Sequence, residues 1–167
     1  IKQLEENNIR ERVLSQDEFK KLLSNCYGDI KGFVLIAYYP PMRQEEIINL
    51  KWEEIDFKHG FIRLGVDRTK NKTVRSIPMH PKIIAYFQCL PRPLKGRFVF
   101  SKRRFNRRAY DKAVEMSSLG DFTFHDLRHC AINNLRLAGN DHFAIKKISG
   151  HKTDSAFQRY NHVTEEE

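Results

Sequence analysis

The sequence predicts an α+β fold that is mainly α-helical, with a small three-stranded antiparallel sheet. Two observations support this prediction. Apolar residues recur at helical spacing in several segments, most of which begin with a capping residue or a proline. Between two of these segments, short β-rich runs are separated by tight polar turns, as in a β-hairpin. Because so small a sheet is marginally stable alone, we expect the helices to pack against it.

Three helices are expected before the sheet. Ser15 begins the sequence SQDE, a capping box in which its side chain accepts a backbone N–H, and this helix runs to about Cys26. Asp29 can cap a second helix, which is apolar and therefore buried from Phe33 to Tyr39. Two prolines end it, and Met42 to Leu50 is predicted as the third.

The sheet is expected from two turns. His59-Gly60 separates the runs IDF and FIRL, and a polar turn from Thr69 to Thr73 precedes a strand from Val74 to Pro78. The remaining helices are predicted from Pro81 to about Leu90, from Lys102 to Ser118, from Phe124 to Leu137 with Gly139 as C-cap, from Asp141 to about Ser149, and in a short segment ending near Tyr160.

Charge and cysteine content limit the function classes. The chain has 167 residues, enough for one domain, and its 30 Lys and Arg against 21 Asp and Glu give a net charge of +9. This excess favours a polyanionic partner, although a merely basic soluble protein would share it. Three scattered cysteines without a CxxC pair argue against a zinc ribbon and fit a reducing compartment such as the cytoplasm. The longest apolar run, Gly32 to Met42, is too short to span a bilayer.

The last third of the chain holds the strongest functional pattern. Its motifs are FHDLRH at 124–129, SGH at 149–151 and RYNHV at 159–163. His125 and Arg128 lie three residues apart and share a helix face. Attack on a phosphodiester without a metal requires fixed cations for the phosphate oxygens, a nucleophile and a proton donor for the leaving oxygen. The residues that can supply these parts are Arg43, Lys70, Arg128, His151 and Tyr160.

These motifs resemble the tyrosine recombinase, or phage-type integrase, family. MRQEEIINLKWEEID is similar to the segment of that family that carries its first arginine, with Arg43 and Glu46 in step, and TKNKTVRSIPM is similar to its lysine-bearing hairpin. The resemblance extends from about Leu14 to Val163. It implies the tyrosine recombinase catalytic-domain fold at 14–167, with residues 1–13 as a linker from a missing N-terminal DNA-binding domain.

The resemblance also implies roles. Tyr160 attacks the scissile phosphate to give a 3′-phosphotyrosyl intermediate, Lys70 protonates the leaving 5′-oxygen, and His125 assists proton transfer. The residues that hold and neutralise the phosphate are Arg43, Arg128 and His151. Glu46 orients an arginine. No metal or other cofactor is implied. The implied partner is double-stranded DNA, on which the bacterial or phage-encoded protein assembles as a tetramer, with the free fragment monomeric.

Several residues have alternative roles. Arg43 and Arg128 could be structural ion-pair partners of Glu46 and Asp126, and His125 could be a satisfied core histidine. Lys72 could replace Lys70 as the hairpin lysine. On a helix, the basic run at 102–108 places Arg103 with Arg107 and Arg104 with Arg108, as a cationic stripe for the DNA backbone or as a solvated face. The candidate DNA-backbone contacts are therefore Lys72, Arg103, Arg104, Arg107 and Arg108.

The sequence departs from the family pattern at three positions. Pro41 stands where Gly is common, Cys130 where Thr or Ser is common, and Ser149 where Leu is common. None of these changes removes a reacting group. Three other functions remain as alternatives: a metalloprotease using the HDLRH histidines, a DNA-binding module without catalysis, and a type IB topoisomerase-like relaxing enzyme. Because the helix at Tyr160 has little predicted packing, we expect that residue to be the most mobile catalytic group in the absence of DNA.

Overall fold

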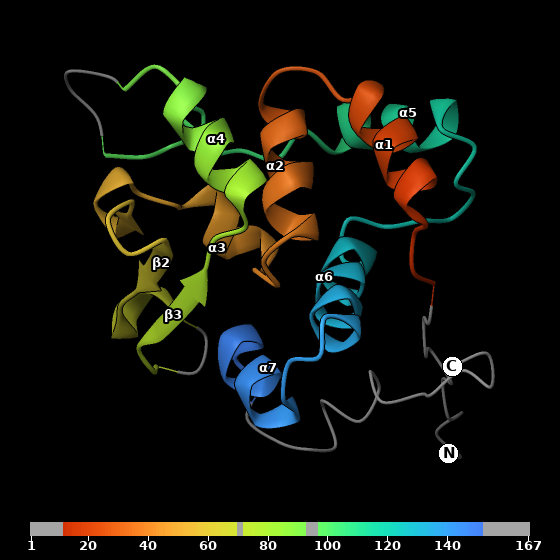
Figure 1. Ribbon diagram of the computed structural model, residues 1–167. Helices are drawn as coiled ribbons and strands as arrows, with labels where there is room; N and C mark the ends of the chain where they lie inside the picture. The colour runs from red at the N-terminus through yellow and green to blue at the C-terminus, as the bar shows by residue number, and fades with distance from the viewer. Residues whose placement is uncertain (1–11, 70–71, 93–96, 152–167) are drawn as a thin grey trace, which may run out of the picture.

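The computed structural model describes residues 12–69, 72–92 and 97–151. The described chain is mainly helical with one three-stranded antiparallel sheet, which confirms the predicted fold class (Figure 1). The helices are α1 (Gln16–Ser24), α2 (Asp29–Tyr38), α3 (Gln44–Ile48), α4 (Pro81–Cys89), α5 (Arg107–Met116), α6 (Asp126–Leu137) and α7 (His142–Ser149). The strands are β1 (Ile55–Asp56), β2 (Phe61–Leu64) and β3 (Arg75–Pro78), and short 3-10 turns span Trp52–Glu54 and Val66–Arg68.

Helix α2 forms the centre of the hydrophobic core. It contacts α1, α3, α4 and α6, and all of its residues except Asp29 and Lys31 are buried. In Figure 1 it lies between α4 and α1, with α6 close to its C-terminal end. The apolar sequence of this helix therefore has a simple cause, since other helices cover nearly its whole circumference.

The sheet brings the third strand beside the last described helix. Its order is β1-β2-β3, and Ile62 in the central strand pairs with Ile55 on one side and Ile77 on the other. All three isoleucines are buried, so one row of the sheet is fixed in register by packing. Strand β3 also contacts α7, which is far away in the sequence. This contact positions the site described below.

The predicted capping box of α1 is present in the structure, whereas the predicted cap of α2 is not. Ser15 accepts the Glu18 N–H at 3.2 Å while Glu18 accepts the Ser15 N–H at 2.9 Å, which confirms the capping box. The helix predicted to begin at Asp141 begins at His142, and Asp141 is its N-cap residue, which accepts the N–H groups of Phe143 and Ala144. The second helix was predicted wrongly at this point, because Gly28, at φ 55°, is its N-cap and no side chain caps it.

Three other predicted helices begin too early. One is α6, which starts at Asp126 rather than Phe124. Helix α3 starts at Gln44 rather than Met42, with Arg43 as its N-cap residue in an extended conformation. The helix predicted from Lys102 starts at Arg107, because Asn106 accepts the Ala109 N–H at 3.2 Å and caps it there. Arg103 has φ 44° and precedes the helix. The predicted cationic stripe, in which Arg103 and Arg107 share one helix face, is therefore wrong.

None of the helices in the described part of the chain is both long and apolar enough to cross a bilayer.

Candidate active site

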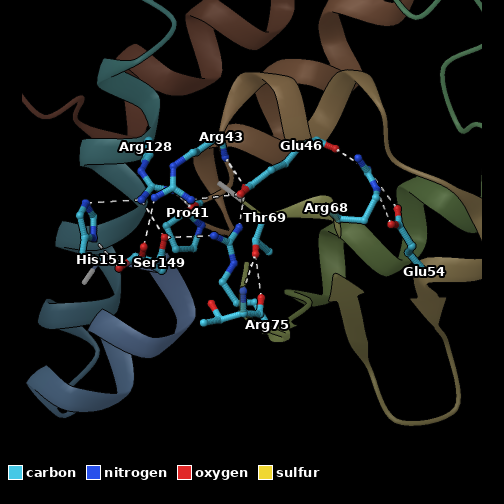
Figure 2. A network of polar contacts seen from close by, with 12 residues as sticks. Pro41, Arg43, Glu46, Glu54, Arg68, Thr69, Arg75, Arg128, Ser149 and His151 are labelled. Carbon is cyan, nitrogen blue, oxygen red and sulfur yellow. Dashed lines mark hydrogen bonds and ion pairs between the residues drawn. The ribbon is translucent and has the colours of Figure 1, made fainter. Parts of the chain in front are cut away.

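Arg43, Arg128 and His151 meet at the C-terminal end of α7 (Figure 2). Arg43 Nη2 donates to the carbonyl of Gly150 at 3.1 Å, and Arg128 Nη2 donates to the carbonyl of Ser149 at 2.7 Å. His151 Nε2 lies 3.5 Å from Arg128 Nη2. The structure thus places these three predicted residues together, although they come from three different segments of the chain.

The C-terminal end of α7 explains this convergence. The last carbonyls of a helix have no partner within the helix and carry the negative end of its dipole, so they attract guanidinium groups. Gly150 allows the chain to turn there with φ 74°, which exposes those carbonyls. Arg128 is itself 3% exposed and also donates to the carbonyl of Pro41, which ties α6 to the end of α2.

Glu46 holds two arginines at once. Its Oε1 lies 3.1 Å from Arg43 Nη1, and its Oε2 accepts the Arg43 backbone N–H at 2.8 Å. The same Oε2 accepts a hydrogen bond from Arg75 Nη2, and both Glu46 and Arg75 are almost fully buried. The ion pair proposed as a structural alternative for Arg43 is therefore present. In the structure Glu46 contacts the side chains of both Arg43 and Arg75.

Arg75 is the site residue that sequence reasoning missed. Its Nη1 donates at 3.3 Å to the Ser149 carbonyl, which also accepts Arg128, so β3 and α6 meet on one oxygen atom. A signal for it existed, because Arg75 and Ile77 are two apart on a strand and must share its buried face. The ion pair of Arg68 with Glu54 was also missed. Arg68 Nε donates to Glu54 Oε1 at 2.6 Å, and its Nη2 donates to the Asn49 carbonyl at 2.5 Å.

His125 does not lie in the core. It is the N-cap residue of α6 and its side chain is exposed, so the alternative of a satisfied core histidine is wrong. Its ring lies 5.2 Å from that of His129, measured between centroids. Desolvation by neighbouring atoms, together with the nearby charge of Arg128, lowers the pKa of His125. Asp126, the candidate ion-pair partner of Arg128, accepts from the Thr123 N–H at 2.7 Å and fixes the start of α6.

Burial lowers the pKa of His151 from 6.5 to about 3, and the charges of Arg128, Arg43 and Arg75 act in the same direction. His151 is consequently neutral at physiological pH. A neutral imidazole next to three guanidinium groups can donate one hydrogen bond to an anion without adding to the positive charge.

This depressed pKa predicts a pH dependence of stability. Between pH 6.5 and about 3 the unfolded chain binds a proton at residue 151 that the folded chain does not bind. The free energy of unfolding therefore falls as the pH decreases through that window and is independent of His151 above it. Between pH 7.5 and 5.5, we expect urea unfolding to show a loss about 1 kcal/mol larger for the wild type than for His151→Gln. His125 contributes equally to both proteins, so equal losses would contradict the assignment.

Gly150 is a second point where stability can be tested. It has φ 74°, and a Cβ atom there would lie 2.5 Å from Arg75 Nη1 and 3.2 Å from Arg75 Cδ. Gly139 is a matched control, because it has φ 78° but no atom within 4 Å of a Cβ. We expect Gly139→Ala to lower the free energy of unfolding by about 1 kcal/mol and Gly150→Ala by about 2 kcal/mol or more. Equal losses in chemical denaturation would show that Arg75 is not held where the structure places it.

Lys70 and Tyr160 lie outside the described residues. The base of the turn that carries Lys70 is described: Thr69 is buried, its Oγ1 donates to the Thr73 carbonyl at 2.8 Å, and it accepts the Thr73 N–H at 3.0 Å. Lys72 is exposed and has φ 51°. The choice between Lys70 and Lys72 as the hairpin lysine stays a prediction.

The basic run lies away from this site. All four of its candidate arginines are exposed, and Arg103 donates to Asn49 Oδ1 at 2.7 Å while its guanidinium lies over the Phe98 ring. The other three, Arg104, Arg107 and Arg108, line a groove of about 1140 Å³ together with Tyr27 and Lys112. Figure 1 shows α5, which follows this run, at the opposite end of the described chain from α7.

The chain is similar in sequence to known proteins. The family model described as "Phage integrase family" matches residues 12–167. The chain belongs to the phage integrase family. This integrase-family chain is 33% identical over 161 residues to the shufflon-specific DNA recombinase of Escherichia coli, covering 92% of the chain and 41% of that relative. It is 26% identical over 187 residues to the integrase of Salmonella phage P22, covering 99% of the chain and 48% of that relative.

Solved structures show the same fold. The crystal structure of XerA recombinase matches with a TM-score of 0.77 at 23% identity, over 93% of this chain and 60% of that one. The catalytic domain of bacteriophage HP1 integrase matches with a TM-score of 0.70 at 23% identity, over 90% of this chain and 86% of that one. The integrase-family chain thus has the catalytic-domain fold that the resemblance implied, and it spans about half the length of the curated relatives it matches.

The metalloprotease alternative has no support in the described ranges of this integrase-family chain. Within them, no three His, Cys, Asp or Glu side chains gather where they could hold a metal ion.

Proposed function

We propose that the chain is the catalytic domain of a site-specific DNA recombinase. The observation that supports this most strongly is the placement of Arg43, Arg128 and a neutral His151 around one point, with Arg75 and Glu46 fixing their geometry. Two guanidinium groups and one neutral N–H donor match a phosphodiester whose non-bridging oxygens gain charge during attack. Family membership supports the same conclusion.

In the proposed mechanism Tyr160 attacks the scissile phosphate. The tyrosyl oxygen forms a bond to phosphorus as the bond to the 5′-oxygen breaks, which leaves a 3′-phosphotyrosyl intermediate and a free 5′-hydroxyl. Arg43, Arg128 and His151 stabilise the charge on the non-bridging oxygens, Lys70 protonates the departing 5′-oxygen and His125 takes part in proton transfer at the nucleophile. A 5′-hydroxyl from a partner strand then reverses the step, so the bond energy is conserved without ATP.

The proposed partner is double-stranded DNA, and solved structures of related folds support it. The Tn1549 transposon integrase was solved in complex with a circular intermediate DNA, and the XerH site-specific recombinase was solved bound to difH substrate. The net charge of +9 is consistent with such a partner, and the exposed arginines at 103–108 and Lys72 are candidate backbone contacts. Residues 1–13 then form the linker from an N-terminal DNA-binding domain, and four copies assemble on the DNA.

A covalent-capture assay tests the proposal. The full-length protein is incubated in EDTA with a nicked duplex that spans the end of its parent element, so that the cleaved strand diffuses away and traps the adduct. We expect a covalent protein–DNA band for the wild type and none for Tyr160→Phe. Tyr86→Phe is the matched control, because Tyr86 lies on α4 and packs against the hydrophobic core, and loss of its hydroxyl should leave the band unchanged.

Two other results would overturn parts of the proposal. If the wild type gives no band, the catalytic function is wrong and a DNA-binding module without catalysis remains. If the band forms but the protein only relaxes supercoiled plasmid and never exchanges strands between two duplexes, the chain acts as a type IB topoisomerase-like enzyme instead.

A further inference from the structure

Ser149 contacts the ring of His151 directly. Its side chain is completely buried at the last residue of α7, and its Oγ lies 2.7 Å from His151 Nδ1. The same Oγ lies 3.2 Å from the Lys146 carbonyl, one helical turn earlier. A serine hydroxyl has one proton, so it can donate to only one of these two acceptors at a time.

The shorter of the two contacts is the one to His151, and either of its atoms could be the donor. A hydroxyl donor normally lies 2.5–3.0 Å from its acceptor. The contact to His151 Nδ1 at 2.7 Å satisfies this range and the contact to the Lys146 carbonyl at 3.2 Å does not. With Nδ1 as acceptor, the proton of the neutral ring is on Nε2.

The contact of Nε2 with Arg128 is the longer of two contacts made by one guanidinium nitrogen. Arg128 Nη2 carries two N–H groups and donates to the Ser149 carbonyl at 2.7 Å, whereas its distance to Nε2 is 3.5 Å, at the outer limit for a hydrogen bond. Ser149 therefore acts on both sides of the site: its carbonyl holds Arg128 and its hydroxyl holds His151 (Figure 2).

We propose that Ser149 is a positioning residue that holds His151 in the Nε2–H tautomer and aims that N–H at the phosphate subsite of Arg43 and Arg128. The catalytic half of this inference rests on the proposed function. Non-bridging phosphate oxygens only accept hydrogen bonds, and a neutral imidazole has a single N–H. In the other tautomer, Nε2 presents a lone pair to the anion and the third donor of the subsite is lost.

This role is specific to the residue found in this chain. A leucine, which is common at this position in the family pattern, has no group that could donate to Nδ1. In the sequence alone, Ser149 is a departure from the family pattern that removes no reacting group. Its contact with His151 is what points to a positioning role.

The tautomer is tested without any reaction, by long-range ¹H–¹⁵N spectra of ¹⁵N-histidine-labelled protein, with the His151 signals assigned from His151→Gln. We expect the wild type to show a single Nε2–H tautomer of His151 near neutral pH, and Ser149→Thr to keep it. In Ser149→Ala both tautomers should be populated. Ser117→Ala is the matched control, since Ser117 is also a buried serine at a helix C-terminus, bonded to the Ala113 carbonyl at 2.6 Å. An Nδ1–H tautomer in the wild type, or unchanged spectra in Ser149→Ala, would overturn the inference.

The catalytic half is tested by the rate of covalent adduct formation at saturating DNA. Loss of one ordinary hydrogen bond predicts a rate about tenfold lower for Ser149→Ala, with DNA affinity unchanged and the rate restored in Ser149→Thr. If the wild type forms adduct and Ser149→Ala matches it, the positioning role is wrong while the proposed function stands. If the wild type forms no adduct although the spectra show the Nε2–H tautomer, the hydrogen bond is correct and the proposed function fails.

Discussion

Replacing Arg128 with lysine is expected to lower the rate of covalent adduct formation by about 10³-fold. The guanidinium uses two nitrogens to donate to the carbonyls of Pro41 and Ser149, and an ammonium group cannot bridge these positions in the same plane. The substitution keeps the charge, so the loss reports the geometry of the fork rather than electrostatic attraction of the DNA. Single-turnover capture at saturating nicked duplex measures it.

Arg136 supplies the control for this prediction. It lies two turns further along α6 and donates to Asn133 Oδ1 at 3.2 Å. Arg136→Lys should form adduct at nearly the wild-type rate. Thermal unfolding of both variants separates folding from chemistry: a folded Arg128→Lys protein with wild-type kinetics would exclude Arg128 from the phosphate subsite.

Replacing Glu46 with glutamine is expected to lower the free energy of unfolding by about 3–5 kcal/mol. The shape of the side chain is kept, but the guanidinium groups of Arg43 and Arg75 lose the carboxylate between them. Arg75 is 3% exposed, so water cannot replace that partner, and an uncompensated buried charge is costly. Chemical denaturation measures the loss, and adduct formation should fall with it because Arg43 is no longer held.

The control is an exposed ion pair of the same residue types. Glu53 is 59% exposed and pairs with Arg97 at 2.9 Å, so Glu53→Gln should change the free energy of unfolding by about 1 kcal/mol or less. A comparable, small effect of Glu46→Gln would mean that the buried network contributes little to stability. A double-mutant cycle with Arg75→Met then shows whether Glu46 and Arg75 interact at all.

Local sequence rules predicted those features of the fold that depend on neighbouring residues. The capping box at Ser15, the first-turn proline at Pro81 and the turn at His59-Gly60 each rest on contacts within a few residues, and the structure contains all three. The start of α5 was missed because Ser101 and Asn106 are both good N-cap residues and the basic run between them has no feature that excludes a helix; the structure uses Asn106.

The predicted residues of the candidate site were found because they resemble a known pattern: these are Arg43, Glu46, Arg128 and His151. Arg75 was missed, although it shares a strand face with Ile77, because an arginine in a short strand is usually expected to face solvent. Its burial follows from two contacts made across the fold, with Glu46 and with the end of α7. The hydroxyl of Ser149 likewise gains its meaning only from the conformation of the residues around Gly150.

The shared acceptor at Ser149 has a consequence for local unfolding. Its single carbonyl oxygen accepts hydrogen bonds from Arg75 on strand β3 and from Arg128 on helix α6. If α7 moves away, the buried guanidinium groups of Arg75 and Arg128 both lose this acceptor. Opening any one of the three elements therefore costs the free energy of disturbing all three. In native-state hydrogen exchange, the backbone amides of β3, of the first turns of α6 and of the last turn of α7 should accordingly exchange through one common opening event.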